Sequence, residues 1–180
     1  MLSIPSTFKR TKRCPNKEEL RFLHNIVKKL IPEDSNILEF GCGITTLAIT
    51  QALKGEYRYI AVEQFKVCIK PVKQHIETVE FITTDWNDIP EIEYDLIFVD
   101  SSTGAPPKLA PVDKKIFRKD SIKFSEPMLK ENGYMITHDW NYHRPQWKNA
   151  ARYPEKLGMT LVDSLESYFG LGVYQKVTTD

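Results

Sequence analysis

The sequence lacks any uninterrupted apolar run of the roughly 18 residues that a membrane-spanning helix needs. Its N-terminus, from Met1 to Arg13, is basic, but no apolar stretch follows it, so it does not have the pattern of a secretory signal. Cysteine is scarce and odd in number, at positions 14, 42 and 68, with no CxxC spacing. These absences predict a cytoplasmic protein with reduced thiols and no membrane partner.

A strong excess of charge of one sign is also missing. The chain has 25 Lys and Arg against 24 Asp and Glu, a formal net charge of +1. This balance counts against nucleic acid as the main partner. Residues 1–30 nevertheless hold eight Lys and Arg against two Glu, a net charge of +6 for this segment. We interpret them as a solvated tail and a polar helix face, with contact between residues 9–13 and an anionic substrate as the alternative.

The composition is that of a globular protein, with 41% hydrophobic and 27% charged residues in 180. We expect one domain over 1–180, with a basic tail at 1–15, an N-terminal helix at 16–31 and a catalytic core at 36–177. Asn16 followed by Glu19 is typical of a capping box, and Pro32 ends the apolar helical pattern.

Apolar runs and helical patterns alternate along the core. Strands are predicted over 36–40, 57–62, 79–83, 94–99, 133–137, 159–164 and 168–177. Helices are predicted over 17–31, 45–53, 65–73, 112–130 and 146–157. This alternation predicts an α/β sheet with right-handed crossovers. Ligands of such sheets bind beyond the carboxyl ends of the strands, so the residues after each strand are the candidate site.

The first strand runs into a glycine turn, Glu39-Phe40-Gly41-Cys42-Gly43. Gly41 and Gly43 permit a sharp turn and close approach of a ligand. A dinucleotide loop of the form GxGxxG would need glycine at position 46, where this chain has Thr46. Glu39 would repel a pyrophosphate but attract an ammonium group. A turn that only joins a strand to a helix is the alternative.

Acidic residues follow the second and third strands. Glu63 can accept hydrogen bonds from both hydroxyls of a ribose. Asp85 can accept from an adenine amino group, while the indole of Trp86 covers the ring. The alternatives are a surface glutamate, a turn aspartate and a packing tryptophan.

Asp100 follows the buried run YDLIFV, where an unpartnered carboxylate would be costly. A metal, a substrate hydroxyl or a cofactor ammonium could satisfy it. The fifth strand ends in a segment rich in polar groups, HDWNYH. Asp139 and Asn141 are hard oxygen donors that suit Mg²⁺ or Mn²⁺. His138 is the first candidate general base and His143 the second, with loop capping as the alternative.

The segments ILEFGCGITT, IAVEQ, TTDW, YDLIFVD and GYMITHDW occur in an order that resembles the class I S-adenosylmethionine-dependent methyltransferases, from about residue 36 to 176. The resemblance implies a Rossmann-like fold: a mostly parallel seven-stranded sheet with an antiparallel last strand and helices on both faces. It also implies cofactor-binding residues around S-adenosylmethionine. These are Glu39, Gly41 and Gly43 at the methionine part, Glu63 at the ribose, Asp85 and Trp86 at the adenine, and Asp100 beside them.

Two narrower resemblances concern the acceptor. The run FVDSSTGAPPKLAP followed by THDWN is similar to the plant glucuronoxylan 4-O-methyltransferase family, which implies a hydroxyl of a sugar or uronic acid. Cation-dependent catechol-type O-methyltransferases carry metal-binding acids at the positions of Asp100 and Asp139. In this chain Trp140 stands where their asparagine would be, and Asn141 lies one position later. The implied metal ligands are therefore Asp100, Asp139 and Asn141.

The sequence as a whole predicts an O-methyltransferase that aligns a small-molecule or carbohydrate hydroxyl with the sulfonium methyl group. Asp100, Asp139 and His138 are the candidate catalytic residues. The helix at 17–31 and the basic tail would form a lid over the acceptor. Two alternatives stay open: a non-catalytic binding or partner protein with this fold, and a nicotinamide-dependent oxidoreductase.

Overall fold

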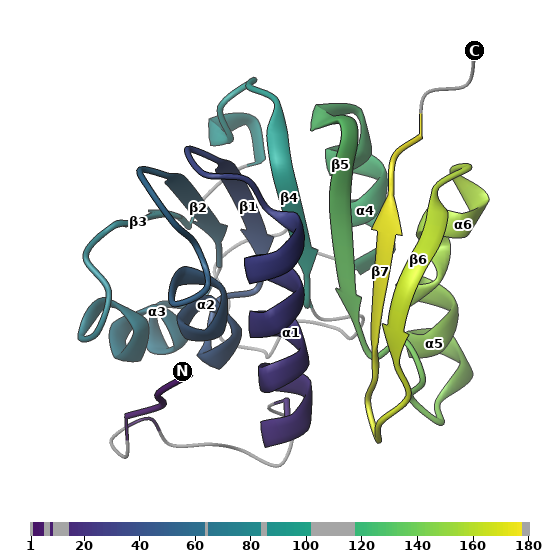
Figure 1. Ribbon diagram of the computed structural model, residues 1–180, viewed down its shortest axis with the longest axis horizontal. Coiled ribbons are helices and arrows are strands. Elements are labelled where there is room, and N and C mark those ends of the chain that lie inside the picture. The colour runs from purple at the N-terminus through teal and green to yellow at the C-terminus, as the bar shows by residue number, and fades with distance from the viewer. Residues whose placement is uncertain are drawn as a thin grey trace.

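A computed structural model describes residues 2–5, 8, 15–63, 65–83, 86–101 and 118–177 (Figure 1). The helices are α1 (Lys17–Leu30), α2 (Ile44–Thr50), α3 (Lys66–Lys73), α4 (Arg118–Ser125), α5 (Pro145–Ala151) and α6 (Tyr153–Lys156), with 3₁₀ turns η1 (Trp86–Asp88) and η2 (Glu126–Met128). The strands are β1 (Asn36–Phe40), β2 (Arg58–Val62), β3 (Val79–Ile82), β4 (Tyr94–Val99), β5 (Leu129–His138), β6 (Thr160–Leu165) and β7 (Leu171–Gln175).

These strands form one sheet in the order β3-β2-β1-β4-β5-β7-β6. Strands β1 to β5 pair in parallel, and β7 lies antiparallel between β5 and β6. The predicted Rossmann-like sheet, mostly parallel with an antiparallel last strand, is confirmed. The order reverses direction between β1 and β4, so the carboxyl ends of these strands border a crevice where such sheets bind ligands.

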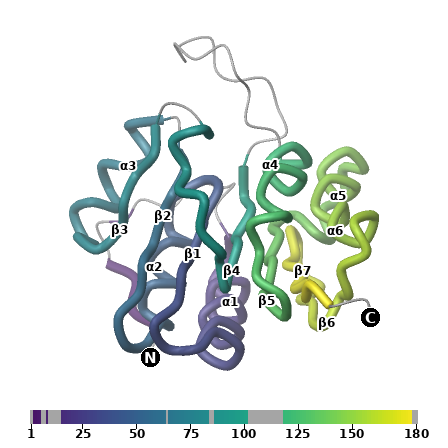
Figure 2. The backbone as a smooth tube through the Cα atoms, turned by 90° about the horizontal axis from the view of Figure 1, so that it is seen from above, coloured from purple at the N-terminus to yellow at the C-terminus, as the bar shows by residue number. Residues whose placement is uncertain are grey.

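The helices cover both faces of the sheet (Figure 2). Alternate residues of a strand point to opposite faces, so neighbours enter different cores. Ile37 packs in a core with the apolar residues of α1, α2 and α3. Leu38 belongs to a second core, which includes Ile122 of α4 and Ala151 of α5. The two cores hold the strands rigidly, which fixes the positions of the residues at their carboxyl ends.

Helix α1 starts at the predicted capping box. Asn16 Oδ1 accepts from the backbone N–H of Glu19 at 2.9 Å, and Glu19 Oε2 accepts from the N–H of Asn16 at 2.7 Å. Leu20 and Leu23 are buried in the first core. Helix α1 is therefore part of the sheet's cover, and the prediction that it forms a lid is wrong. Residues 9–13 of the predicted tail lie outside the described residues.

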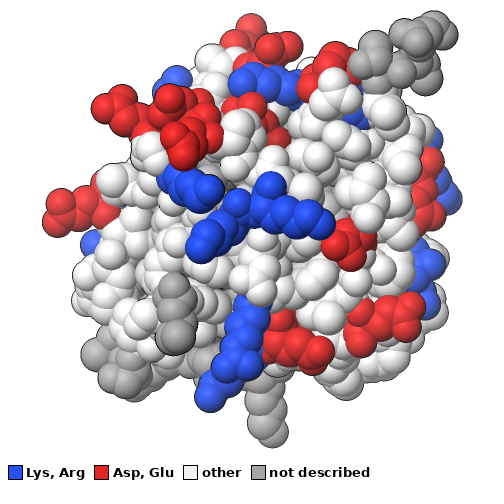
Figure 3. All heavy atoms as spheres, viewed as in Figure 1, with Lys and Arg blue, Asp and Glu red and all other residues white. Residues whose placement is uncertain are grey.

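The outer face of α1 is basic. Figure 3 shows Lys and Arg side chains over the middle of this face of the molecule, where α1 lies. The exposed basic residues of the helix are Lys17, Arg21, Lys28 and Lys29. This agrees with the interpretation of the local positive charge as a polar helix face. Within the described ranges, no helix is long and apolar enough to cross a membrane.

Two predicted helices differ most from the structure in their bounds, and the helix expected over 45–53 also ends earlier, at Thr50. The helix expected over 112–130 is described from Arg118, ends at Ser125 and gives way to η2 and then β5. Pro127 interrupts the helical hydrogen bonds there, and Leu129 pairs with Tyr94 of β4. The helix expected over 146–157 is divided into α5 and α6. Both changes occur at prolines, Pro127 and Pro154, whose effect the periodicity of apolar residues does not show.

Candidate active site

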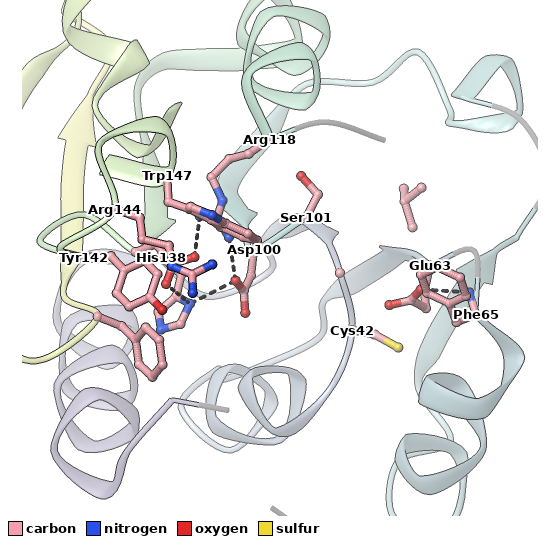
Figure 4. A pocket seen from close by; sticks show the side chains of 14 residues that line it. Cys42, Glu63, Phe65, Asp100, Ser101, Arg118, His138, Tyr142, Arg144 and Trp147 are labelled. Atoms are coloured by element: carbon pink, nitrogen blue, oxygen red, sulfur yellow. Dashed lines mark hydrogen bonds and ion pairs between the residues drawn. The ribbon is translucent and has the colours of Figure 1, made fainter. Parts of the chain in front are cut away.

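A cavity of about 360 Å³ lies at the carboxyl ends of β1, β2, β4 and β5 (Figure 4). Its lining comes from the glycine turn after β1, from the residues after β2 and β4, and from α4, α5 and the loops beside them. The lining residues are Gly41, Cys42, Val62, Glu63, Phe65, Asp100, Ser101, Arg118, His138, Asp139, Tyr142, Arg144, Trp147 and Phe169. The strand ends that the sequence singled out therefore meet at one cavity.

The glycine turn passes close to the end of β4. Gly41 has a φ of +93°, and a Cβ at this position would lie 3.0 Å from the carbonyl oxygen of Asp100. Only glycine permits this combination of backbone angle and contact. Gly41 and Cys42 line the cavity, whereas Gly43 is the N-cap of α2 and does not line it. Burial raises the pKa of the Cys42 thiol, so this cysteine is an inert wall residue.

Glu39 is fully buried beneath this turn. Its carboxylate accepts hydrogen bonds from Thr45 Oγ1 at 2.8 Å, Thr46 Oγ1 at 2.6 Å and the hydroxyl of Tyr59 at 2.9 Å. Burial raises the pKa of Glu39 to about 8, against the effect of these three donors. Thr46 also accepts from the N–H of Gly43 at 2.9 Å. The geometry therefore assigns Glu39 to the turn and not to the cavity, which departs from the predicted cofactor contact.

Glu63 closes the other end of the cavity, where Figure 4 shows it beside Phe65. It is largely buried, and its Oε1 accepts from the backbone N–H of Phe65 at 2.8 Å. The ring of Trp86 packs against those of Phe40 and Phe124, at centroid distances of 5.8 and 4.9 Å respectively. Trp86 does not line the cavity. Asp85 lies outside the described residues.

Asp100 and Asp139 face each other across one guanidinium. Arg118 Nη2 lies 2.9 Å from Asp100 Oδ1, and Arg118 Nη1 lies 2.6 Å from Asp139 Oδ2. Arg118 is only 1% exposed. Asp139 has a φ of +62°, a left-handed conformation that is uncommon outside glycine and often marks functional sites. The predicted pair of acids is thus assembled, together with a cation that sequence reasoning missed.

His138 completes a buried chain of alternating charges. Its Nδ1 lies 2.9 Å from Asp100 Oδ1, and its Nε2 lies 3.9 Å from Glu19 Oε2. Burial alone would lower the pKa of His138, but the charge of Asp100, with those of Glu19 and Asp139, raises it to about 10. At neutral pH the ring is therefore an imidazolium with no lone pair to accept a proton. The prediction of His138 as general base does not fit this charge state.

Two other predicted residues lie away from the cavity lining. His143 is exposed and packs edge-on against Tyr142 with ring centroids 4.3 Å apart. The backbone N–H of Asn141 donates to the carbonyl of Phe169 at 2.8 Å, and its Cβ packs against Gly170. Neither His143 nor Asn141 is among the described residues that line the cavity.

Aromatic rings form the wall opposite the glycine turn. Tyr142 and Phe169 lie with ring centroids 5.1 Å apart, and the Arg118 guanidinium lies 5.3 Å from the ring centroid of Trp147. Arg144 lines the same wall. The sequence alone assigned no role to these aromatic residues. For Tyr142 and Trp147 the available signal was their place after the fifth strand, whereas Phe169 lies in the loop before β7.

No family model and no curated protein matches the sequence. Solved structures do match its fold. The O-methyltransferase of Bacillus cereus in complex with SAH has a TM-score of 0.68 at 16% identity, over 92% of this chain and 84% of that one. TomG of Streptomyces achromogenes, an O-methyltransferase of tomaymycin synthesis in complex with SAM, has a TM-score of 0.62 at 14% identity, over 92% and 82%. A methyltransferase of Geobacter sulfurreducens has a TM-score of 0.62 at 13% identity, over 91% and 80%.

The fold is that of the class I methyltransferases. The place of β7, antiparallel between β5 and β6, distinguishes this methyltransferase fold from the all-parallel dinucleotide-binding sheet. The hydroxyl of Thr46, where a third glycine would lie, is bound to Glu39 and leaves no phosphate-binding GxGxxG turn. Both observations count against the nicotinamide-dependent oxidoreductase.

Proposed function

We propose that this protein transfers the methyl group of S-adenosylmethionine to a hydroxyl oxygen of a small-molecule acceptor. One observation carries the proposal. A single cavity at the switch point of a methyltransferase fold has the Gly41 turn and Glu63 at one end and the Asp100–Asp139 cluster at the other. Proteins that bind a nucleoside and align it with a second reactant need such a two-ended site.

The first end suits the nucleoside. Glu63 is the acid at the end of β2, and a ribose placed beside it can donate both hydroxyls to its carboxylate. The turn at Gly41 lets the ligand approach the backbone without a side chain between them. Asp85 and Trp86 are retained from the sequence as candidate adenine contacts.

The ion-pair cluster at the second end carries one excess negative charge. Three carboxylates, those of Glu19, Asp100 and Asp139, face two cations, Arg118 and the His138 imidazolium. This excess favours a cationic sulfonium beside the cluster, while the exposed Arg144 also lines the cavity but takes part in none of these ion pairs. S-adenosylmethionine supplies a methyl group that the sulfonium has already activated.

The chemical step needs alignment and one proton acceptor. A lone pair of the acceptor oxygen forms the new O–C bond, and the electron pair of the C–S bond stays on sulfur. Both Arg118 and His138 form their hydrogen bonds with Asp100 Oδ1. The other oxygen, Oδ2, accepts no hydrogen bond from the described part of the chain. We assign the acceptor's proton to Asp100 Oδ2, from which it passes to water.

The aromatic wall supports the sugar or uronic acid acceptor that the sequence resemblance implied. Tyr142 and Trp147, which line the cavity, offer apolar surface to a sugar ring, and Arg144 can pair with a carboxylate. A uronic acid presents both features together with free hydroxyls. An aromatic alcohol with an acidic group is the second acceptor to test, because the same wall stacks planar rings.

Calorimetric titration with S-adenosylmethionine and SAH tests the proposal first. We expect micromolar binding by the wild type and at least tenfold weaker binding by Glu63→Gln. Glu80→Gln, an exposed change on β3, is the matched control and should bind as the wild type does. Failure of the wild type to bind either compound would reject the proposal.

Turnover then separates an enzyme from a non-catalytic binding protein. Transfer of a radiolabelled methyl group would be measured with glucuronic acid, glucose and catechol as acceptors. Asp100→Asn should keep the affinity for SAH, which has no sulfonium charge, within about threefold and lower turnover by about a hundredfold or more, as expected for loss of a proton acceptor. Equal losses in affinity and turnover would place Asp100 in the cofactor site instead.

A further inference from the structure

The cation between Asp100 and Asp139 belongs to the protein itself. We propose that Arg118 permanently fills the position that a divalent metal would take, so that these two carboxylates bind no Mg²⁺ or Mn²⁺. Only the role of Arg118 in catalysis rests on the proposed function; the prediction about metal binding does not. Metal binding and cofactor binding can each be measured without turnover, so the two proposals fail separately.

The donor set does not fit a metal. Ligand atoms of Asp100, His138 and Asp139 lie within 4.8 Å of one another, which by itself would suit an ion. However, Arg118 nitrogens already lie 2.6 and 2.9 Å from the two carboxylates. Mg²⁺ needs six donors at about 2.1 Å in near-octahedral geometry. The predicted third ligand, Asn141, packs against Gly170 instead of lining the cavity.

The arginine cannot easily give way to an ion. Its guanidinium does not lose its proton at accessible pH, so it keeps its charge and repels a divalent cation. The side chain is 1% exposed and is covered by the ring of Trp147 at 5.3 Å. Its displacement would leave a buried charge with no partner, which is strongly unfavourable.

This arrangement gives Arg118 a positioning role. Its two nitrogens join the ends of β4 and β5, because Asp100 follows one strand and Asp139 follows the other. The bond to Asp100 is made through Oδ1, which leaves Oδ2 for a ligand. A guanidinium fixes this carboxylate without coordinating the acceptor oxygen. The acceptor hydroxyl therefore relies on Asp100 and not on a Lewis acid.

Titration with Mn²⁺, followed by the paramagnetic resonance of the free ion, tests the proposal. We expect no uptake by the wild type up to about 1 mM Mn²⁺, and S-adenosylmethionine affinity unchanged by a chelator. Uptake below about 100 µM that Asp139→Asn abolishes would overturn the proposal. Uptake that Asp139→Asn leaves intact would place the ion elsewhere and support the proposal for this pair.

The variant Arg118→Met removes the charge and keeps a side chain of similar length. We expect it to take up Mn²⁺ below about 100 µM, at least tenfold below the 1 mM limit for the wild type, and to be stabilised against heat by Mn²⁺, whereas Arg118→Lys shows neither effect. A purely structural arginine would give no such gain, and a folded Arg118→Met without Mn²⁺ binding would overturn the proposal. If Arg118→Met does not fold, the Mn²⁺ titrations of the wild type and of Asp139→Asn still test the proposal.

Discussion

Glu19 Oε2 of α1 lies 3.9 Å from His138 Nε2 at the end of β5, and both side chains are buried. Glu19 is also the capping-box residue of α1. It accepts the backbone N–H of Gly170 at 3.0 Å and the hydroxyl of Ser167. One carboxylate thus connects the start of the first helix, the loop before β7 and the charged side chains of the candidate active site.

Replacement of Glu19 by Gln should lower the free energy of unfolding by about 3 kcal/mol at pH 7, because it leaves the His138 cation without this partner. Burial would raise the pKa of Glu19, but the interactions with His138, Ser167 and backbone N–H groups lower it to about 2. A lowered carboxyl pKa stabilises the fold above pH 4.5 and loses that effect as the pH falls towards 2.

Urea unfolding at pH 7, 4 and 3 would measure this dependence. The difference between wild type and Glu19→Gln should shrink steadily as the pH falls. Glu18→Gln is the matched control, since Glu18 is the exposed neighbour in the same helical turn. Equal effects of the two substitutions would show that helix charge, and not the link to His138, explains the loss.

Replacement of Thr46 by Gly tests whether the glycine turn is a GxGxxG loop that lacks its third glycine or a turn that the Thr46 hydroxyl stabilises. Thr46→Gly would create the sequence GxGxxG, which could improve a nucleotide-binding loop if that were its role. Here the hydroxyl donates to Glu39 and accepts from the N–H of Gly43, and both contacts would be lost. We expect thermal unfolding to show a loss of about 2 kcal/mol and no gain in cofactor affinity. A more stable variant would contradict this account.

Much of this molecule could be predicted from its sequence. Strand ends came from short apolar runs such as 94–99, and parallel pairing brings those ends to one edge, so the meeting of Asp100 with His138 and Asp139 followed. The capping box of α1 followed from a local spacing. These inferences succeeded because the relevant periodicity or connection is local or is dictated by the sheet.

The rest depends on how distant elements pack. Arg118 lies in a predicted helix with no motif around it, and only the docking of α4 brings it between the two acids. Glu19 reaches His138 from the opposite end of the chain. Glu39 was assigned to the cofactor because an acid before a glycine turn can attract an ammonium group, and nothing in the local pattern showed that the hydroxyls of Thr45 and Thr46 bind it instead. Contacts of this kind leave no periodic signal.

Glu39 should also make stability depend on pH. Burial raises its pKa to about 8, so the folded protein keeps a proton that the unfolded chain releases above pH 4.5. Stability should therefore fall by about 3 kcal/mol from pH 5 to 8 through this group. Glu39→Gln, which stays neutral, should remove that part of the slope in urea unfolding, whereas exposed Glu80→Gln should not. An unchanged slope would show that Glu39 is ionised throughout.

Arg144 offers a test of acceptor choice that leaves the buried charges untouched. It lines the aromatic wall and is exposed, so its replacement should not weaken the fold. If it pairs with a carboxylate of the acceptor, Arg144→Gln should raise the KM for glucuronic acid about tenfold, with kcat and the KM for glucose nearly unchanged. Lys148→Gln is the matched control, because Lys148 lies in the α5 helix that Arg144 precedes but does not line the cavity. An equal rise in the KM for glucuronic acid and for glucose would mean that Arg144 affects the cavity wall but does not bind the carboxylate of the acceptor.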